Sequence, residues 1–577
     1  MSYRLEVEPK GLYARLSSPG GDPWLRISLL SAFDKTDGVD ETLAVEVRED
    51  GDTIEVERRS TIWGRAGTTI VRKDDTLEVR AWVEGEGVLA DVHLLGGRPL
   101  LAGAPTGFSS TGHAFETLFS PNPGDPAKLT RGAGESAVIG VAGDGTPGRG
   151  HWFFTPAPLF FALDSLGFGL AAPVDELRFV QAEYRPGDKA FHLVLDYDGH
   201  THVDGRFDAP AIVLRPGLED PYQGIRRHRD DLVEHGFVPK RAVVEADWWS
   251  EPMFCGWGAQ CYLASQNGRG APAQATQQNY DGFLTALEAH GIVPGTVVID
   301  DKWQDSYGTN APDTAKWPDL TGWIAERHAR EQRVLLWWKA WDPEGLPPEL
   351  CICTPDGVPI AMDPTNPAAR ELLRAQMWQM LSPDGLDADG LKVDFTARTP
   401  SGRALTAHGD GWGIALLHDL LRTVYAAAKD AKRDALVITQ TPHPSFVDVT
   451  DMVRLNDMLR LDDPGAPPRK ANDRPCRSPR EHPIGEASPP GRPLSPIVPQ
   501  MRYRAAVAGA ACPEVLIDTD DWTISDKATW REYVDAKLEL GVPSLYYATH
   551  LDLTGEALED DDYELLRLSW ERWRAAL

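Results

Sequence analysis

The residues best suited to chemistry are charged side chains set among apolar residues in the second half of the chain. In residues 391–395, Lys392 and Asp394 alternate with Leu391, Val393 and Phe395. A charged side chain in a buried strand is costly unless it is paired or used. Lys392 and Asp394 share one face of an ideal strand, because residues i and i+2 do. The segment therefore predicts either a catalytic carboxylate beside a lysine or a buried structural ion pair.

Polar and aromatic side chains follow most of the other short apolar segments as well. If those segments are parallel strands of one barrel, their C-terminal ends meet at one rim, where such enzymes place their active sites. Like charges gathered there repel each other unless a ligand or a proton offsets them. The candidates for contact with a ligand are Asp300, Asp301, Lys392, Trp303, Trp257, Trp338, Lys339, His443 and Asp520.

The elements that must position these residues alternate between strand and helix from about residue 250. Apolar strand cores are followed by longer segments with helical spacing. The predicted strands are residues 253–257, 297–300, 334–338, 390–394, 436–439, 452–455, 515–518 and 544–547. The predicted helices are residues 280–290, 320–331, 368–380, 412–428, 501–511, 527–540 and 563–576. Eight such strands indicate an α/β fold of the (β/α)8 TIM barrel type.

The first part of the chain, up to about residue 240, has a β pattern. Short segments such as residues 53–58 and 76–83 alternate apolar and polar side chains between Gly, Pro and Asp-rich turns. This pattern is typical of an antiparallel β-sandwich. Residues 221–236 have the composition of a charged connecting helix, with Gly236 as its C-terminal stop. We therefore expect an N-terminal β-sandwich domain over residues 1–240 and a barrel over residues 241–577.

Composition narrows the classes of function. The chain of 577 residues is 42% hydrophobic and 25% charged, which is ordinary for a globular protein. Its formal net charge of -29 disfavours nucleic acid and anionic membranes as partners. The six cysteines form no zinc-type spacing, so we expect neither a metal nor a cofactor. We find no secretory signal and no apolar run long enough to span a membrane, so we expect a cytoplasmic protein.

Two carboxylates on different strands, with aromatic and hydroxyl-binding neighbours, suit cleavage of a glycosidic bond. One carboxylate attacks the anomeric carbon or stabilises the cation formed there, and Asp394 is our candidate. The other protonates the leaving oxygen, and Asp457 at the end of the sixth predicted strand is our candidate. Other acids nearby compete for that second role, namely Asp451, Asp462 and Asp463.

Three stretches give the chain a resemblance to a known group of enzymes. Residues 298–303 (Val-Ile-Asp-Asp-Lys-Trp), 391–395 (Leu-Lys-Val-Asp-Phe) and 454–457 (Arg-Leu-Asn-Asp) resemble motifs of the α-galactosidase superfamily of retaining glycoside hydrolases, families 27, 36 and 31. A β-sandwich ahead of a barrel is closest in architecture to family 36. The third strand and residues 441–444 depart from the family 36 pattern, which leaves the sugar open.

The resemblance implies a role for each matching residue. It implies that Asp394 is the nucleophile, that Asp457 is the acid/base, and that Asp300, Asp301 and Lys392 contact the sugar. The implied activity is that of a retaining α-glycosidase acting on a small α-linked carbohydrate, with α-galactosidase ahead of α-glucosidase or α-xylosidase. A transglycosidase similar to raffinose synthases would use the same residues.

Two further readings come from the residues themselves. A barrel that has lost its acid would be a sugar-binding protein, and Asp and His at the rim would also suit a metal-assisted hydrolase, although no ligand spacing favours a metal. Residues 462–499 form a Pro and Arg-rich insertion after the sixth predicted strand. Such a long loop predicts either a lid over the site or an insertion without a role.

Overall fold

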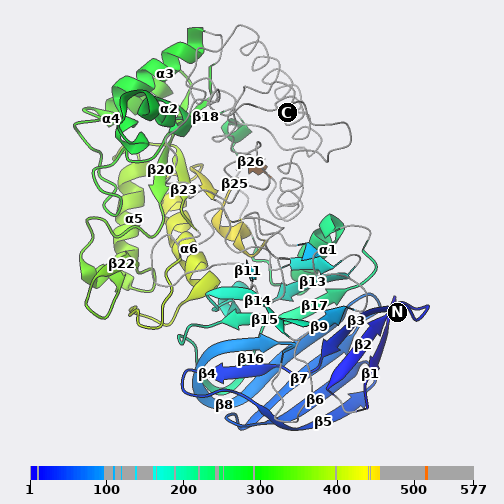
Figure 1. Cartoon of the computed structure of the whole chain (residues 1–577). Helices are drawn as coiled ribbons and strands as arrows, with labels where there is room; N and C mark the ends of the chain where they lie inside the picture. The colour runs from blue at the N-terminus through cyan, green and yellow to red at the C-terminus, as the bar shows by residue number, and fades with distance from the viewer. Residues whose placement is uncertain are drawn as a thin grey trace.

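The computed structural model of the chain describes its first part and most of the segment that follows. The described residues are 2–9, 12–96, 108–110, 118–119, 137–139, 160–163, 166–187, 190–218, 221–240, 246–250, 253–289, 293–396, 399–439, 441, 444–454 and 514–516. Figure 1 shows antiparallel strands at one end of the molecule, and a parallel sheet with its helices at the other.

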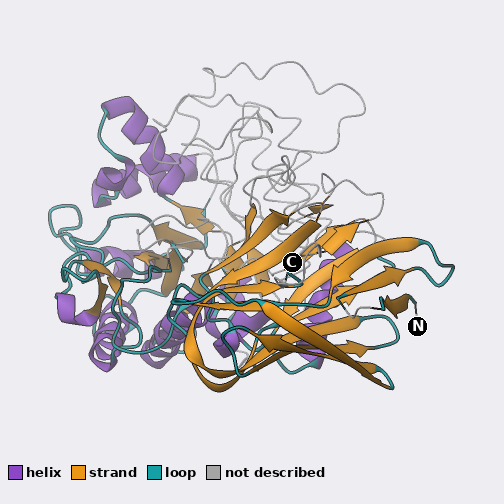
Figure 2. Ribbon diagram, turned by 60° about the horizontal axis from the view of Figure 1, so that its bottom comes forward, coloured by secondary structure: helices purple, strands orange, loops and turns teal. Residues whose placement is uncertain are grey.

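Two antiparallel sheets make up the part between residues 4 and 215, called here the antiparallel region (Figure 2). One sheet contains β1 (Arg4–Val7), β2 (Tyr13–Ser17), β3 (Pro23–Ser28), β4 (Ala32–Lys35), β9 (Phe108–Ser110), β11 (Ala137–Ile139), β14 (Gln181–Gly187) and β15 (Ala190–Asp196). The other contains β5 (Thr42–Asp50), β6 (Thr53–Ser60), β7 (Arg65–Arg72), β10 (Leu118–Phe119), β12 (Phe160–Leu163), β13 (Leu166–Ala171), β16 (His202–Asp208) and β17 (Ala211–Arg215). The expected antiparallel sandwich is therefore present.

The long strand β8 (Leu77–Leu94) joins the two sheets. Its first part pairs with β7, β16 and β17, and its last part pairs with β4 and β15. Gly85 adopts a φ of 148° where β8 passes over the indole of Trp63, a conformation that L side chains rarely adopt. Alternation places the core: in β6, Ile54 and Val56 are fully buried while their neighbours are only partly covered.

The parallel sheet lies between residues 253 and 516 and is called here the parallel-sheet region. In spatial order its strands are β18 (Met253–Cys255), β19 (Thr296–Ile299), β20 (Arg333–Lys339), β23 (Gly390–Asp394), β24 (Leu436–Thr439), β25 (Met452–Arg454) and β26 (Glu514–Leu516). Each pairs in parallel with the next in the chain. Seven predicted strands are thus confirmed within a residue or two at most ends. The eighth, at 544–547, lies outside the described residues, so closure into a (β/α)8 barrel stays a prediction.

Among the described residues, helices follow the strands as predicted, with one addition, while the predicted helices at 501–511, 527–540 and 563–576 lie outside the described residues. Those described are α1 (Pro221–Glu234), α2 (Trp257–Asn267), α3 (Gln277–Ala289), α4 (Leu320–His328), α5 (Pro367–Leu381) and α6 (Gly413–Ala431). Asp319 caps α4 by accepting from the Gly322 amide, and Asn366 caps α5 by accepting from Ala368. The sequence did not predict α2, which begins directly after β18. A small antiparallel hairpin, β21 (Cys351–Cys353) and β22 (Pro359–Met362), precedes α5.

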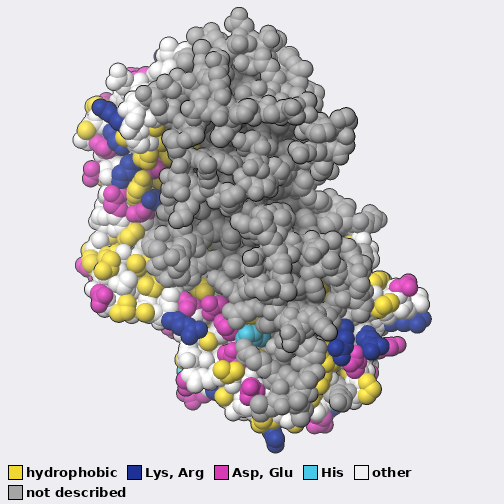
Figure 3. Space-filling model, viewed as in Figure 1, with side chains coloured by type: hydrophobic (Ala, Val, Ile, Leu, Met, Phe, Trp, Pro, Cys, Tyr) yellow, Lys and Arg dark blue, Asp and Glu magenta, His cyan; other side chains and the backbone are white. Residues whose placement is uncertain are grey.

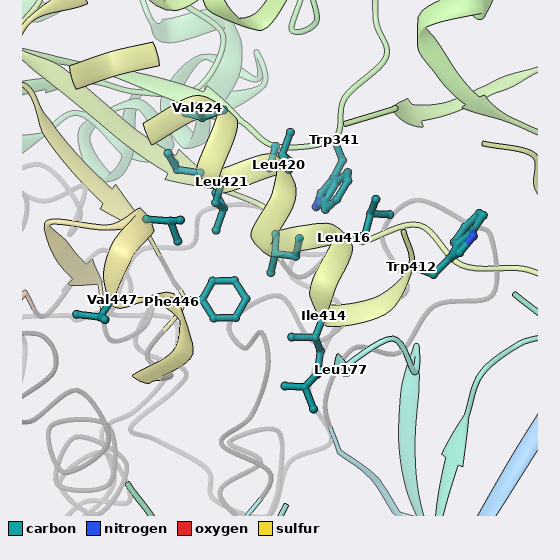
Figure 4. Packing of buried hydrophobic residues seen from close by; sticks show 14 of the residues in the cluster. Leu177, Trp341, Trp412, Ile414, Leu416, Leu420, Leu421, Val424, Phe446 and Val447 are labelled. Carbon is teal, nitrogen blue, oxygen red and sulfur yellow. The ribbon is translucent and has the colours of Figure 1, made fainter. Parts of the chain in front are cut away.

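The two regions touch through the start of α6. The Ala415 amide donates to the Leu177 carbonyl at 3.0 Å, and Figure 4 shows Leu177 beside Ile414. The His200 ring stacks on Trp412 with a centroid distance of 3.5 Å. Gly413 has a φ of 64°, and an added Cβ there would lie 2.3 Å from the Phe179 carbonyl oxygen, so only glycine fits. The helix that follows β23 is therefore seated on the antiparallel region.

Charges are mixed on the surface that can be seen. Figure 3 shows acidic and basic side chains close together over the described parts of one face. Ion pairs among the described residues include Arg65 with Glu57 at 3.0 Å and Arg206 with Asp208 at 2.8 Å. None of the helices in the described ranges has the length and apolar character that a membrane crossing requires.

Candidate active site

The strand β23 places Lys392 and Asp394 on one face of the sheet, as its alternation predicts. Asp394 is the last residue of the strand, and its Oδ2 accepts from the Trp337 indole at 3.0 Å. Its Oδ1 accepts from the Phe395 amide at 2.8 Å, and Phe395 has a φ of 61°. A left-handed backbone is uncommon for a bulky residue, and such strain gathers at functional sites. Asp394 is therefore fixed at the C-terminal end of its strand.

Lys392 is fully buried and is neutralised by a carboxylate from another strand. Its Nζ donates to Asp300 Oδ2 at 2.8 Å and to the Cys255 sulfur at 3.2 Å. The side chains of Lys392 and Asp300 are 1% and 2% exposed, respectively. Breaking such a pair would leave an uncompensated buried charge, whereas the intact pair holds both groups in one geometry.

Asp300 is surrounded by donors and has few directions left for a ligand. Its Oδ2 also accepts from the Cys255 thiol at 3.0 Å, and its Oδ1 accepts from the Asp301 amide at 2.8 Å. Its own amide donates to the Tyr280 hydroxyl at 2.7 Å, and that hydroxyl donates to Gln260 Oε1 at 2.9 Å. The buried Asp300 is thus built into the scaffold beneath the site.

Asp301 differs from its neighbour because it is only half-buried. Its Oδ1 accepts from the Tyr307 hydroxyl at 2.7 Å. Burial raises the pKa of Asp301 to about 7, and the charges of Asp300 and Asp394 push it the same way, against the Tyr307 hydrogen bond and Lys339. A carboxyl group with this pKa exchanges its proton near neutral pH, as groups that do acid/base or hydroxyl-binding work often do.

Two lysines flank the Tyr307 ring. The ammonium groups of Lys302 and Lys339 each lie 3.9 Å from the ring centroid. Lys339 pairs with Asp342 at 2.7 Å and is the ladder partner of Asp394, while Lys302 pairs with Glu344. Burial, together with Asp301, raises the pKa of Tyr307, so Tyr307 stays a hydrogen-bond donor. Lys339 therefore lies beside the candidate nucleophile, and its contact with a sugar stays a prediction.

The predicted aromatic contacts are placed differently from Lys339. Trp303 is fully buried, and its indole donates to the Trp337 carbonyl at 2.8 Å. Trp338 is 2% exposed and points away from Asp394, because neighbouring strand residues alternate. Neither presents a ring face to solvent, and Trp337 is the tryptophan that contacts Asp394. Trp257 is half-buried at the start of α2, against the core.

Several candidates lie outside the described residues, namely His443, Asp457, Asp462, Asp463 and Asp520, together with the insertion at 462–499. Asp451, the remaining rival of Asp457, is described. It precedes β25 and accepts from Tyr425 at 2.8 Å, from Lys429 at 2.6 Å and from the Val437 amide at 2.9 Å. Asp451 is fully buried, and it lies at the opposite end of the strands from Asp394. It is therefore not placed to act as the acid/base beside Asp394.

Asp389 occupies the matching position before β23. It accepts from His328 at 2.7 Å and from the Val334 amide at 2.9 Å, with Lys432 at 3.3 Å. Burial alone would raise the pKa of Asp389, but His328, Lys432 and the Val334 amide together lower it. We call Asp389 and Asp451 the N-terminal rim, and Asp300, Asp301, Lys392 and Asp394 the C-terminal rim.

One group among the described residues has the composition of a metal site. The ligand atoms of Asp34, Asp91 and His93 lie within 4.8 Å of one another, and His93 Nε2 is 3.2 Å from Asp34 Oδ2. These residues belong to β4 and β8 of the antiparallel region, not to the C-terminal rim. Among the described residues, the groups at the rim are carboxylates, a lysine and a thiol.

Comparison with known proteins defines the fold. No family model matches the sequence, and a search of curated proteins also finds no match. Solved structures do match over nearly the whole chain. A GH31 sulfoquinovosidase from E. rectale has a TM-score of 0.57 and 12% identity, with 99% of this chain and 82% of that chain covered.

Two other structures give similar values. The α-N-acetylgalactosaminidase NagBb from Bifidobacterium bifidum has a TM-score of 0.59 and 12% identity, with 100% of this chain and 92% of that chain covered. The cycloalternan-forming enzyme from Listeria monocytogenes has a TM-score of 0.54 and 11% identity, with 98% of this chain and 58% of that chain covered. The chain therefore shares its fold with glycoside hydrolases. At these identities the likeness extends to the fold alone, and a family 36 architecture is not confirmed.

Proposed function

We propose that the chain is a retaining glycoside hydrolase that removes a terminal α-linked sugar, with Asp394 as its nucleophile. The observation that carries the proposal is the setting of Asp394. It ends a parallel strand, its two oxygens are held by the Trp337 indole and the Phe395 amide, and Lys392 lies on the same face one step below. The fold shared with the sulfoquinovosidase and with NagBb supports the same class of reaction.

The proposed reaction has two steps. Asp394 attacks the anomeric carbon while an acid protonates the departing oxygen, and water then hydrolyses the glycosyl-enzyme with the same acid acting as base. Asp457 is our proposal for that acid/base. Lys392 lies buried beneath Asp394 on the same face of β23, and Asp301 offers a carboxyl group whose pKa of about 7 lets it exchange hydrogen bonds with a sugar hydroxyl.

The sugar is the finer part of the proposal. The motif resemblance places an α-galactoside first, and α-glucosides and α-xylosides follow. The NagBb and sulfoquinovosidase folds add α-N-acetylgalactosaminides and sulfoquinovosides to the substrates worth testing. Lys339, the ladder partner of Asp394, is paired with Asp342 and places a cation at this part of the rim.

The test is a panel of aryl α- and β-glycosides of these sugars, with the wild type beside Asp394→Asn. We expect release of the aryl group from one α-glycoside, and loss of that release in the variant. Equal release by the variant would remove Asp394 as nucleophile. Aryl release without free sugar would identify a transglycosidase. Sugar binding by calorimetry without any turnover would identify a binding protein.

A further inference from the structure

A thiol lies where three strands of the parallel sheet converge beneath the candidate nucleophile. Cys255 ends β18, Asp300 follows β19, and Lys392 lies in β23. The Cys255 sulfur is 3.0 Å from Asp300 Oδ2 and 3.2 Å from Lys392 Nζ, and those two atoms are 2.8 Å apart. The Cys255 thiol, the Asp300 carboxylate and the Lys392 ammonium thus form a hydrogen-bonded triangle. Their residues are 0%, 2% and 1% exposed, respectively, so the triangle is closed to bulk water.

The chemistry of the triangle requires a group that both donates and accepts. Asp300 is an acceptor and the Lys392 ammonium is a donor. A thiol joins them because its S–H donates to the carboxylate and its sulfur accepts from the ammonium. An apolar side chain in this place would leave both charged groups short of a partner in a buried setting, where an unmade hydrogen bond is expensive.

The surroundings fix the thiol in this position. The residue after it is Gly256, and an added Cβ there would lie 2.0 Å from the Tyr280 hydroxyl. That hydroxyl accepts from the Asp300 amide at 2.7 Å, so the glycine allows Tyr280 to hold the same aspartate that Cys255 holds. Cys255 thus fixes Asp300 by direct contact, and Gly256 does so by leaving room for Tyr280.

We propose that Cys255 is a positioning residue: its thiol fixes Lys392 and Asp300 relative to each other and so sets the place of Lys392 beneath Asp394. The inference rests on the proposed function, because it concerns the same site. If Cys255 only filled space in the core, any small side chain at this position would support the same activity. The two roles can be distinguished by two small replacements, one that keeps a hydrogen-bonding group and one that lacks it.

The experiment compares Cys255→Ser with Cys255→Ala, which differ by one hydroxyl group. With the aryl glycoside that the wild type hydrolyses, we expect kcat/KM of Cys255→Ser to stay within about threefold, and that of Cys255→Ala to fall about tenfold, the range for one hydrogen bond to a charged group. The matched control is Cys351→Ala, because Cys351 is a buried free thiol in β21 whose sulfur lies 3.5 Å from the Pro347 carbonyl oxygen. Circular dichroism establishes that each variant is folded.

A second measurement tests whether Cys255 acts through Lys392. The ratio of kcat/KM between Cys255→Ser and Cys255→Ala, called here the contrast, is measured again in a Lys392→Met background, with a substrate that carries an activated aryl leaving group. We expect the contrast to vanish, because residues that act through each other are not additive. Equal kcat/KM for Cys255→Ser and Cys255→Ala, or an unchanged contrast in the Lys392→Met background, would overturn the inference and leave the proposed function standing. A wild type that neither hydrolyses nor binds any sugar would overturn both.

Discussion

The carboxylates at the two ends of the same parallel strands differ in their hydrogen-bond partners and in their exposure to solvent. At the N-terminal rim, Asp389 and Asp451 each accept from at least two donors that include a cationic or ionisable side chain, and both are buried. At the C-terminal rim, Asp394 and Asp301 are only half-buried, and the pKa of Asp301 is raised to about 7. Asp389 and Asp451 therefore fasten helices to strands at one end. At the other end Asp394 and Asp301 are more exposed, beside the buried ion pair of Asp300 with Lys392.

The difference teaches how a carboxylate's role can be recognised. The partners of Asp451 come from the preceding helix and strand, Tyr425, Lys429 and the Val437 amide. Asp394 accepts from the Trp337 indole and from the amide of the residue that follows it. A carboxylate that neutralises a lysine from the preceding helix stabilises the fold, since its loss leaves an unpaired buried charge. Asp394 differs from Asp451 in exposure, because it is half-buried whereas Asp451 is fully buried.

The largest effect that would sharpen this comparison is expected at Asp394. Replacement by alanine should lower kcat by roughly 10⁴-fold or more, because a nucleophile and its partners act as one catalytic group. Added azide should restore turnover by entering the space of the lost carboxylate, and the product should be a glycosyl azide of inverted configuration. Product analysis by NMR checks this. Turnover by the variant without azide would place the nucleophile elsewhere.

The second effect belongs to the N-terminal rim. Asp451→Asn should lower the free energy of unfolding by about 3–5 kcal/mol, because Lys429 is left beside a neutral group in a buried setting. The kcat of the folded variant should stay close to that of the wild type. Urea unfolding and steady-state kinetics measure the two quantities. Asp419→Asn, which breaks an exposed pair with Arg422, is the control and should cost less than about 1 kcal/mol. A stable but inactive Asp451→Asn would break the comparison.

The smallest effect is the pH dependence that Asp301 gives to stability. Below pH 7 the folded protein keeps Asp301 protonated, whereas an unfolded Asp ionises above about pH 4. The folded state therefore binds the extra proton, and stability falls as pH rises from about 4 to 7. Asp301→Asn removes this loss, so the free energy of unfolding of the variant relative to the wild type should rise by about 2–3 kcal/mol between pH 5 and pH 8.

Thermal unfolding at the two pH values checks the Asp301 prediction. Asp305→Asn changes an exposed carboxyl group on the same loop and should show no such gain. If the difference between Asp301→Asn and the wild type does not change with pH, Asp301 is ionised in the folded protein like an ordinary surface carboxylate.

Much of the parallel sheet could be predicted from the sequence. Buried parallel strands are nearly continuous apolar runs, so seven of them were found within a few residues, and Asp394 was placed at the end of its strand. The helix α2 was missed because its residues show almost no amphipathic pattern and follow β18 without a turn signal. The placement of Lys392 and Asp394 on one face followed from alternation alone and is confirmed.

The contacts across strands could not be predicted. Choosing between Trp337 and Trp338 requires the register of β20 against β23, which the sequence does not state. Cys255 lies 45 residues before Asp300 and 137 before Lys392, so nothing local joins them. Tyr280 and Tyr307 lie in a helix and a loop whose side chains reach the aspartates only once the fold is formed.

The packing of the start of α6 against the antiparallel region has a consequence for evolution and for protein engineering. The next helix after β23 begins against Leu177 and Phe179, with Trp412 stacked on His200. A parallel-sheet region transplanted onto a foreign sandwich would lose the surface against which this helix begins. We expect the antiparallel region and the parallel-sheet region to have evolved together. A chimera should fold only when the segments around Leu177 and His200 are transferred along with the parallel-sheet region.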